Sequence, residues 1–177
     1  MNYFQFYDIP VSFHPDENLL KKKFYALSKE YHPDFYVNES EEKQNEVLEL
    51  STQNNNAFKV LSHPVKRLEY ILELNNLIQE GEKHQLPQAF LMEMMDINEM
   101  LMELEFNEDE QQIAEIKEQV RSLDQVLTEE LKELTNGFET LSEEERKNIL
   151  LKIKDNYYKS KYLLRIQEKL HTFATRN

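Results

Sequence analysis

Cysteine and tryptophan are absent from this 177-residue chain, and glycine occurs only twice. Without cysteine the chain can form no disulfide and no thiolate metal site, it cannot ligate an iron–sulfur cluster through thiolates, and it has no cysteine nucleophile. Runs of valine or threonine, which favour strands, are also scarce. Leucine, glutamate, lysine and glutamine are abundant instead, and all four favour helices. We therefore predict an all-α fold.

A broad basic surface is missing as well, because the formal net charge is −13. Phosphate binding requires such a surface, so nucleic acid is not expected as the main partner. No stretch approaches the roughly eighteen uninterrupted apolar residues of a membrane helix. The N-terminus has neither the basic start of a secretory signal nor the arginine-rich character of a transit peptide. We expect a soluble, cytoplasmic protein with no membrane partner.

Catalytic groupings are not evident either. A histidine base at His32, oriented by Asp34, is one enzyme alternative, but two such residues on an exposed turn need not touch. No serine or cysteine nucleophile motif, glycine-rich phosphate loop or second catalytic carboxylate accompanies them. The histidines also lack the spacing of metal ligands: they are His14, His32, His63, His84 and His171. We predict no catalytic residue, no metal site and no cofactor.

The N-terminus is rich in aromatic residues, which are Tyr3, Phe4, Phe6 and Tyr7. No basic residues are interleaved with them, so a platform for stacking bases is not favoured. A short helix whose rings enter the core is the better interpretation.

A His-Pro-Asp tripeptide at residues 32–34 stands between two helical patterns. The first pattern ends at Tyr31, and Pro33 stops it because proline lacks an N–H and disfavours the α conformation of its predecessor. The second begins after Asn38. Each pattern has one apolar face: Leu20, Phe24, Leu27 and Tyr31 before the tripeptide, and Val47, Leu50, Asn54, Phe58 and Leu61 after it. Two antiparallel helices packed this way would leave His32, Pro33 and Asp34 at an exposed hairpin tip.

A second copy of the tripeptide lies at residues 14–16. Asp16 directly precedes the first of these helical patterns, where a carboxylate can accept free N–H groups and complement the positive end of the helix dipole. We predict that this copy is a helix start.

These features together resemble a J-domain: a short first helix, a basic helix containing residues 21–23 and 29, the tripeptide at His32, and a third helix ending in the run 55–61. With the second half of the chain, they resemble the HscB (Hsc20) family, the J-type co-chaperones of iron–sulfur cluster assembly. The resemblance implies that an HscA-like Hsp70 binds through its ATPase half to the tip and the basic helix. The residues implied are His32, Pro33, Asp34, Lys22 and Lys29.

Two departures and one alternative accompany this resemblance. Phe35 follows Asp34 where the family commonly has lysine, and Asn54 occupies a place usually held by an aliphatic residue, which would put an amide near the core. Charge runs are commonly solvated helix faces, so the lysines alone would not establish a docking surface.

A polar stretch over residues 80–85 suggests a boundary. We predict a J-domain over 1–76, a linker over 77–86 and an antiparallel three-helix bundle over 87–177. In its first helix, Phe90 or Leu91 would begin the core stripe that continues through Met94, Ile97, Leu101 and Leu104. The second helix would start at 107–110 and end at 136–137, and a capping box at 142–145 would open the third. Ile149, Ile153, Tyr157 and Leu164 would form the core stripe of that third helix.

Met92 and Met95 are left outside the core stripe, near acidic residues. Most helical methionines fill a core, yet exposed apolar residues rimmed by carboxylates suit a protein-binding face. The HscB resemblance favours the second interpretation, because a Phe-Leu-Met-Glu run opens the domain that binds the iron–sulfur scaffold protein. The implied contacts with an IscU-like scaffold are Leu91, Met92, Met95, Asp96, Glu99 and Glu103, with Tyr162 or Tyr158 from the last helix.

Two co-chaperone functions are therefore open. In the first, the protein stimulates the ATPase of an Hsp70 and delivers an iron–sulfur scaffold to it. In the second, it is a J-domain adaptor for a different Hsp70 client.

Overall fold

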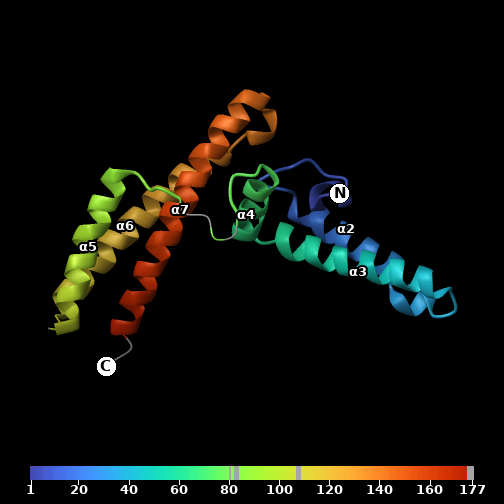
Figure 1. Cartoon of the computed structure of the whole chain (residues 1–177), viewed down its shortest axis with the longest axis horizontal. Coiled ribbons are helices and arrows are strands. Elements are labelled where there is room, and N and C mark those ends of the chain that lie inside the picture. The colour runs from blue at the N-terminus through green and yellow to red at the C-terminus, as the bar shows by residue number, and fades with distance from the viewer. Residues whose placement is uncertain (80, 82–83, 107–108, 175–177) are drawn as a thin grey trace. The chain divides into compact units, whose positions relative to one another are not determined.

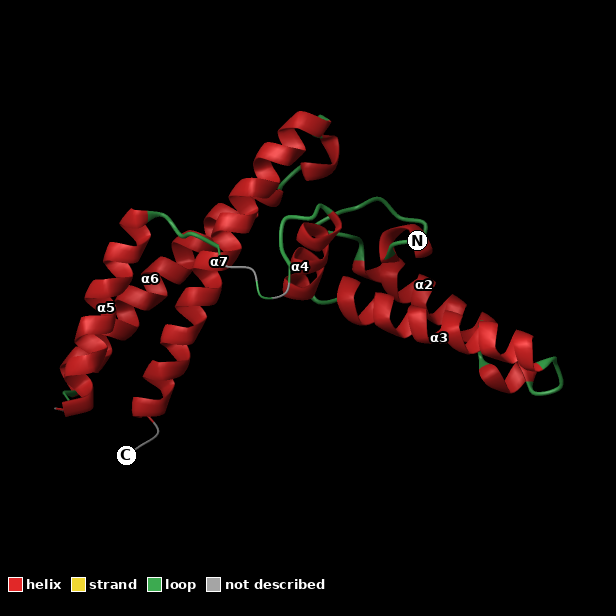
Figure 2. Cartoon of the chain, viewed as in Figure 1, coloured by secondary structure: helices red, strands yellow, loops and turns green. Residues whose placement is uncertain are grey.

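The computed structural model describes residues 1–79, 81, 84–106 and 109–174, and within these ranges it contains helices and no strand (Figure 2). The α-helices are α1 (Tyr3–Phe6), α2 (Glu17–Glu30), α3 (Glu41–Leu61), α4 (Pro64–Leu74), α5 (Gln88–Phe106), α6 (Glu110–Thr135) and α7 (Glu143–Ala174). Two short 3-10 helices accompany them, η1 (Pro33–Tyr36) and η2 (Phe138–Thr140). The prediction of an all-α fold is confirmed. None of the helices in the described ranges is both long and apolar enough to span a membrane.

The helices form two compact units. The first comprises Met1–Ile78 with Gly137–Leu141, and the second comprises Gln79–Asn136 with Ser142–Asn177. Residues 80, 82 and 83 of the predicted linker lie outside the described part of the chain. The assignment of 1–76 and 87–177 to functional domains stays a prediction.

The first unit places the N-terminal aromatic residues in its core. The side chain of Asn2 caps α1, accepting from the Gln5 N–H at 2.9 Å. Phe4 and Tyr7 are then fully buried. The prediction of a core role for this aromatic stretch is confirmed for these two rings.

Helices α2 and α3 lie side by side as a hairpin, with η1 at its tip (Figure 1). Asp16 caps α2 by accepting from the N–H groups of Asn18 and Leu19 at 2.8 and 3.1 Å. The first His-Pro-Asp copy is therefore a helix start, as predicted. Ser40 caps α3 in the same way, accepting from the Lys43 N–H at 3.3 Å.

A buried hydrogen-bond network joins α2 and α3 to the residue that ends α1. The hydroxyl of Tyr7 donates to Asn54 Oδ1 at 2.9 Å, and Asn54 Nδ2 donates to Phe24 O at 3.1 Å and to Ser28 Oγ at 2.9 Å. Burial raises the pKa of Tyr7, so this hydroxyl keeps its proton and remains a donor. The amide that the sequence placed near the core is thus satisfied on both its donor and acceptor sides, as burial requires.

The second unit is a bundle of α5, α6 and α7. Its core contains the predicted stripe of α5, with Phe90 as its first member rather than Leu91. The buried members of the core are Phe90, Met94, Ile97, Leu101, Leu104, Ile116, Val120, Leu127, Leu163, Ile166, Leu170 and Phe173. The predicted antiparallel three-helix bundle agrees with this arrangement.

The bounds of α6 and α7 follow from their caps. Residues 107 and 108 of the predicted start of α6 lie outside the described residues, and Asp109 is the N-cap, accepting from the Gln111 N–H at 2.9 Å. Gly137 follows α6 with a left-handed φ of 68°. The capping box of α7 is present: Ser142 N donates to Glu145 Oε2 at 2.9 Å, and Glu145 N donates to Ser142 Oγ at 3.3 Å.

The predicted core stripe of α7 is wrong at Leu164, which is exposed. Ile153 and Tyr157 are buried as expected, and Ile149 is only partly buried beside the buried Leu150. The apolar face then passes to Leu163 and Ile166. In its C-terminal half α7 contributes to a core shared with both α5 and α6, so its buried face turns to cover both neighbours. A stripe extrapolated from the first half of the helix cannot include this rotation.

We predict that Asn54→Ala lowers the free energy of unfolding by about 1–3 kcal/mol, because it removes the buried partner of Tyr7 and of Ser28. Asn56→Ala, at an exposed position of the same helix, should change it by no more than about 0.5 kcal/mol. Urea unfolding measures both variants. It also measures Tyr7→Phe and the double variant that combines Asn54→Ala with Tyr7→Phe, which should lose less stability than the sum of its two single changes. Equal stability of the two asparagine variants would mean that the network contributes nothing.

Candidate functional site

The His-Pro-Asp tripeptide forms the start of a short fixed helix at the hairpin tip. His32 is the N-cap of η1 and Pro33 is its first residue, where a missing N–H costs nothing. The hydroxyl of Tyr36 donates to the Glu30 carbonyl at the end of α2 at 2.9 Å. The tip is therefore hydrogen-bonded to the helix that precedes it, and its three motif residues are exposed.

The imidazole of His32 and the carboxylate of Asp34 do not form a base–orienter pair. Nδ1 of His32 accepts from the backbone N–H of Asp34 at 3.3 Å, whereas its distance to Asp34 Oδ2 is 3.7 Å, too long for a hydrogen bond. With Nδ1 acting as acceptor, the neutral ring carries its proton on Nε2. Both side chains face solvent, so the arrangement suits contact with another molecule better than proton abstraction.

The two copies of the tripeptide use their aspartates differently. The carboxylate of Asp16 is occupied by two backbone N–H groups of α2. The carboxylate of Asp34 is exposed and lies beside an exposed histidine. Asp16 is exposed as well, so the two copies differ in that its carboxylate is engaged in capping α2 whereas that of Asp34 lies beside His32.

Lys22 and Lys29 lie on α2, seven residues apart and thus on one helix face that leads toward the tip. Both are exposed, and neither has an ion-pair partner among the described residues. Lys23, by contrast, lies 4.0 Å from Asp8. The predicted pair of lysines is therefore available to a partner.

The outer face of α5 exposes the predicted apolar residues. Leu91, Met92 and Met95 are 38%, 61% and 68% exposed, whereas Met94, on the opposite face, is buried. Asp96, Glu99 and Glu103 are exposed on the same outer side. One of these acids is engaged, since Glu103 Oε2 accepts from Gln112 Nε2 of α6 at 2.8 Å.

The two aromatic candidates on α7 lie in different surroundings. Tyr162 is partly buried, accepts a hydrogen bond from Asn98 Nδ2 at 3.0 Å, and packs edge-on against Phe90 with ring centroids 6.0 Å apart. Tyr158 is stacked against the ring of His84, with centroids 4.5 Å apart. Tyr162 thus contacts α5 through Asn98 and Phe90, while Tyr158 is covered on one side by His84 of the predicted linker.

Two apolar residues of this face were missed by the sequence reasoning. Met102 and Phe106 are exposed and extend the line of Leu91 and Met95 at i+11 and i+15. Their helical spacing was visible in the sequence and could have identified them. A groove of about 700 Å³ between α5 and α7 lies beside them, lined by Asn98, Leu101, Met102, Glu105, Lys169, Thr172 and Phe173.

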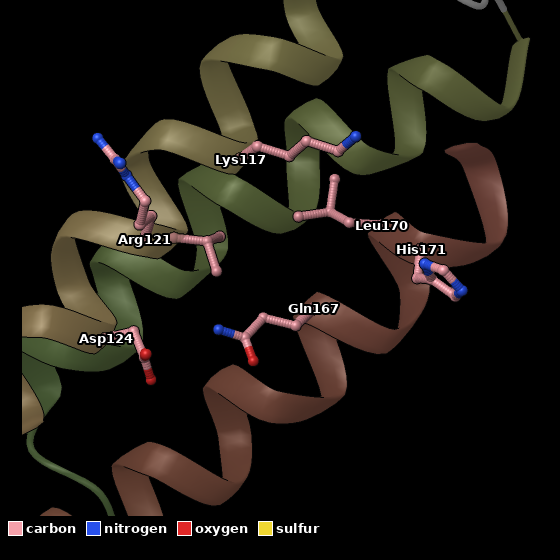
Figure 3. Close-up of a pocket in the computed structure, with 7 residues that line it drawn as sticks. Lys117, Arg121, Asp124, Gln167, Leu170 and His171 are labelled. Carbon is pink, nitrogen blue, oxygen red and sulfur yellow. The ribbon is translucent and has the colours of Figure 1, made fainter. Parts of the chain in front are cut away.

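A second groove of about 250 Å³ lies between α6 and α7 (Figure 3). Val120 and Leu170 provide its apolar part, and Lys117 reaches across above Leu170. Arg121 is directed away from Leu170 and pairs with Glu118 at 2.8 Å. Within the described residues, no group of three or more His, Cys, Asp or Glu side chains could hold a metal ion. Among the described residues, this groove therefore offers no metal-binding group.

Comparisons with known proteins all point to the same family. A family model described as the HSCB C-terminal oligomerisation domain matches residues 86–171. A co-chaperone protein HscB homolog of Haemophilus influenzae is 37% identical over 141 residues, which cover 74% of this chain and 79% of that relative. The crystal structure of human co-chaperone protein HscB superposes with a TM-score of 0.69 at 28% identity, covering all of this chain and 84% of the other. Chaperone HscB from Vibrio cholerae has a TM-score of 0.59 at 24% identity over 99% of both chains, which shows a shared fold.

Proposed function

The chain belongs to the HscB family of J-type co-chaperones in iron–sulfur cluster biogenesis, and we propose that it stimulates the ATPase of an HscA-like Hsp70 and delivers an IscU-like scaffold protein to it. In this proposal the J-domain over 1–76 binds the Hsp70, and the bundle over 87–177 binds the scaffold. The observation that carries the proposal is the exposed His-Pro-Asp tripeptide on a hydrogen-bonded tip at the end of the α2–α3 hairpin.

The Hsp70 surface would consist of His32, Pro33 and Asp34 together with Lys22 and Lys29. In this proposal the tripeptide would perform no bond chemistry itself. The exposure of His32 and Asp34, which are not paired as a catalytic base and its orienter, supports a contact role. Its contacts would instead favour the Hsp70 conformation that is competent for hydrolysis. The lysines would steer the approach of an acidic face on the partner.

The scaffold surface would consist of Leu91, Met92 and Met95 with a rim of carboxylates from Asp96, Glu99 and Glu103, and Tyr162 at the edge toward α7. Exposed methionines on a rigid helix give an adaptable apolar contact, and the acids favour a client face with basic groups. Joining this surface to the Hsp70 site in one chain would raise the effective concentration of client and chaperone for one another.

We predict that His32→Gln abolishes stimulation of the Hsp70 ATPase and leaves the thermal midpoint unchanged, because the side chain is exposed and its loss exposes no buried group. His14→Gln is the matched control, since it alters the other copy of the tripeptide, and stimulation should persist. Single-turnover ATP hydrolysis measures both. Equal loss from the two substitutions would refute the assignment of function to residues 32–34.

We predict that reversing Lys22 and Lys29 to Glu weakens Hsp70 stimulation without changing client binding. The steering by exposed lysines is screened by salt, because the Debye length falls from about 10 Å at 0.1 M to about 3 Å at 1 M. Stimulation by the unmodified protein should therefore decline as salt rises, and the reversed variant should show a smaller decline. If stimulation changes neither with salt concentration nor with the reversal, the lysines form an ordinary solvated helix face.

We predict that replacing Leu91, Met92 and Met95 together by Ala removes most of the scaffold binding, at about 1–3 kcal/mol for each central apolar anchor. The thermal midpoint should barely move, because all three side chains are exposed. Isothermal titration with the scaffold and a melting curve on the same variant test both statements.

Two controls accompany the triple variant. Val126→Ala removes an exposed apolar side chain from α6 and should leave binding intact. Met94→Ala truncates a buried residue of α5 and should cost about 2–5 kcal/mol of stability. Full scaffold affinity in a folded triple variant would show that this face is not the client site. No scaffold binding by the unmodified protein would instead favour a different client, which a pull-down with the full chain would identify.

A further inference from the structure

Phe35 follows the His-Pro-Asp tripeptide directly, and its side chain is 68% exposed. The exposure results from a fixed backbone. Phe35 N donates to the His32 carbonyl at 3.0 Å, and its neighbour Tyr36 donates its hydroxyl to the Glu30 carbonyl at 2.9 Å. The short helix η1 thus holds a large apolar ring in solvent, and its segment is fixed by a backbone hydrogen bond at Phe35 and a side-chain hydrogen bond at Tyr36.

The ring of Phe35 lies next to the residue on which the Hsp70 site depends. The centroids of the Phe35 and His32 rings are 5.5 Å apart, with their planes inclined at 51°. Any surface that covers the His32 ring therefore also meets Phe35. Phe35 is continuous with the proposed Hsp70 interface.

The tip has no lysine or arginine that could make a charged contact with the partner in place of Phe35. Residues 30–42 contain no lysine or arginine, and their formal charges are all negative: Glu30, Asp34, Glu39, Glu41 and Glu42. The available cations, Lys22 and Lys29, lie on α2. The docking surface is thus divided into a basic helix face and a tip whose exposed contacts are apolar and acidic.

We infer that Phe35 is an apolar anchor that enters an apolar depression on the ATPase half of the Hsp70, next to the surface that receives His32. This inference rests on the proposed function, since the partner is the Hsp70 assigned there. Removal of the ring from water would lengthen the lifetime of the complex, whereas the lysines of α2 would mainly raise its rate of formation. Hsp70 proteins that lack the depression would be poor partners, so Phe35 would contribute to partner choice.

The test is a titration of the Hsp70 with the full chain in single-turnover ATP hydrolysis, at about 0.1 M and about 1 M salt. Phe35→Ala should raise the concentration needed for half-maximal stimulation about tenfold, the effect of losing an interface anchor worth about 1.4 kcal/mol. The increase should be similar at both salt concentrations, because an apolar contact is not screened. Phe35→Leu should retain most of the affinity, and Phe35→Lys should behave like Phe35→Ala at high salt.

Val65→Ala is the matched control, because it removes an exposed apolar side chain from α4 of the same unit and should leave the titration unchanged. His32→Gln separates this inference from the function on which it rests. Unchanged half-maximal stimulation by Phe35→Ala, with activity lost in His32→Gln, would overturn the anchor and leave the Hsp70 function standing. Undiminished stimulation by both variants would overturn the proposed function itself.

Discussion

The packing of α2 against α3 depends on a buried amide. Asn54 joins the hydroxyl of Tyr7 to the backbone of α2 at Phe24, so one side chain connects the end of the first helix with both helices of the hairpin. A buried amide is tolerated only when its donors and acceptors are satisfied, and this requirement admits one register of α2 along α3. An aliphatic residue at this position, which the family commonly has, would impose no such hydrogen-bonding requirement. The position of the tip relative to the lysines of α2 therefore follows from a polar constraint within an apolar interface.

Most of the fold was predictable because its signals are local. The caps at Asp16 and Ser40 and the capping box at Ser142 are read from a few neighbouring residues, and the core stripe of α5 follows from helical periodicity. Leu164 shows where such reasoning ends, since the buried face of α7 depends on which neighbours the helix has along its length. The role of Asn54 was also beyond the sequence, because its partners lie 26 to 47 residues away.

The candidate sites divide in the same way. The exposure of His32 and Asp34 followed from proline chemistry and the helix pattern around them. The roles of the residues on α5 came from family resemblance, since helical spacing alone permits both a core and a surface position for Met92 and Met95. Met102 and Phe106 were missed because the resemblance covers only the opening motif of α5. The line of exposed apolar residues that begins at Leu91 continues through them to the end of the helix.

The two His-Pro-Asp copies are under different constraints, because one carboxylate caps a helix and the other faces solvent. A cap requires only a short side chain that accepts a hydrogen bond, so serine, threonine or asparagine could replace Asp16 at little cost to folding. The same exchanges at Asp34 would keep the fold and change the charge that a partner meets. Neutral drift should therefore erase the first copy among descendants of this sequence while the second persists. The capping chemistry of Asp16 is sufficient to account for the first copy of the tripeptide without a second partner site.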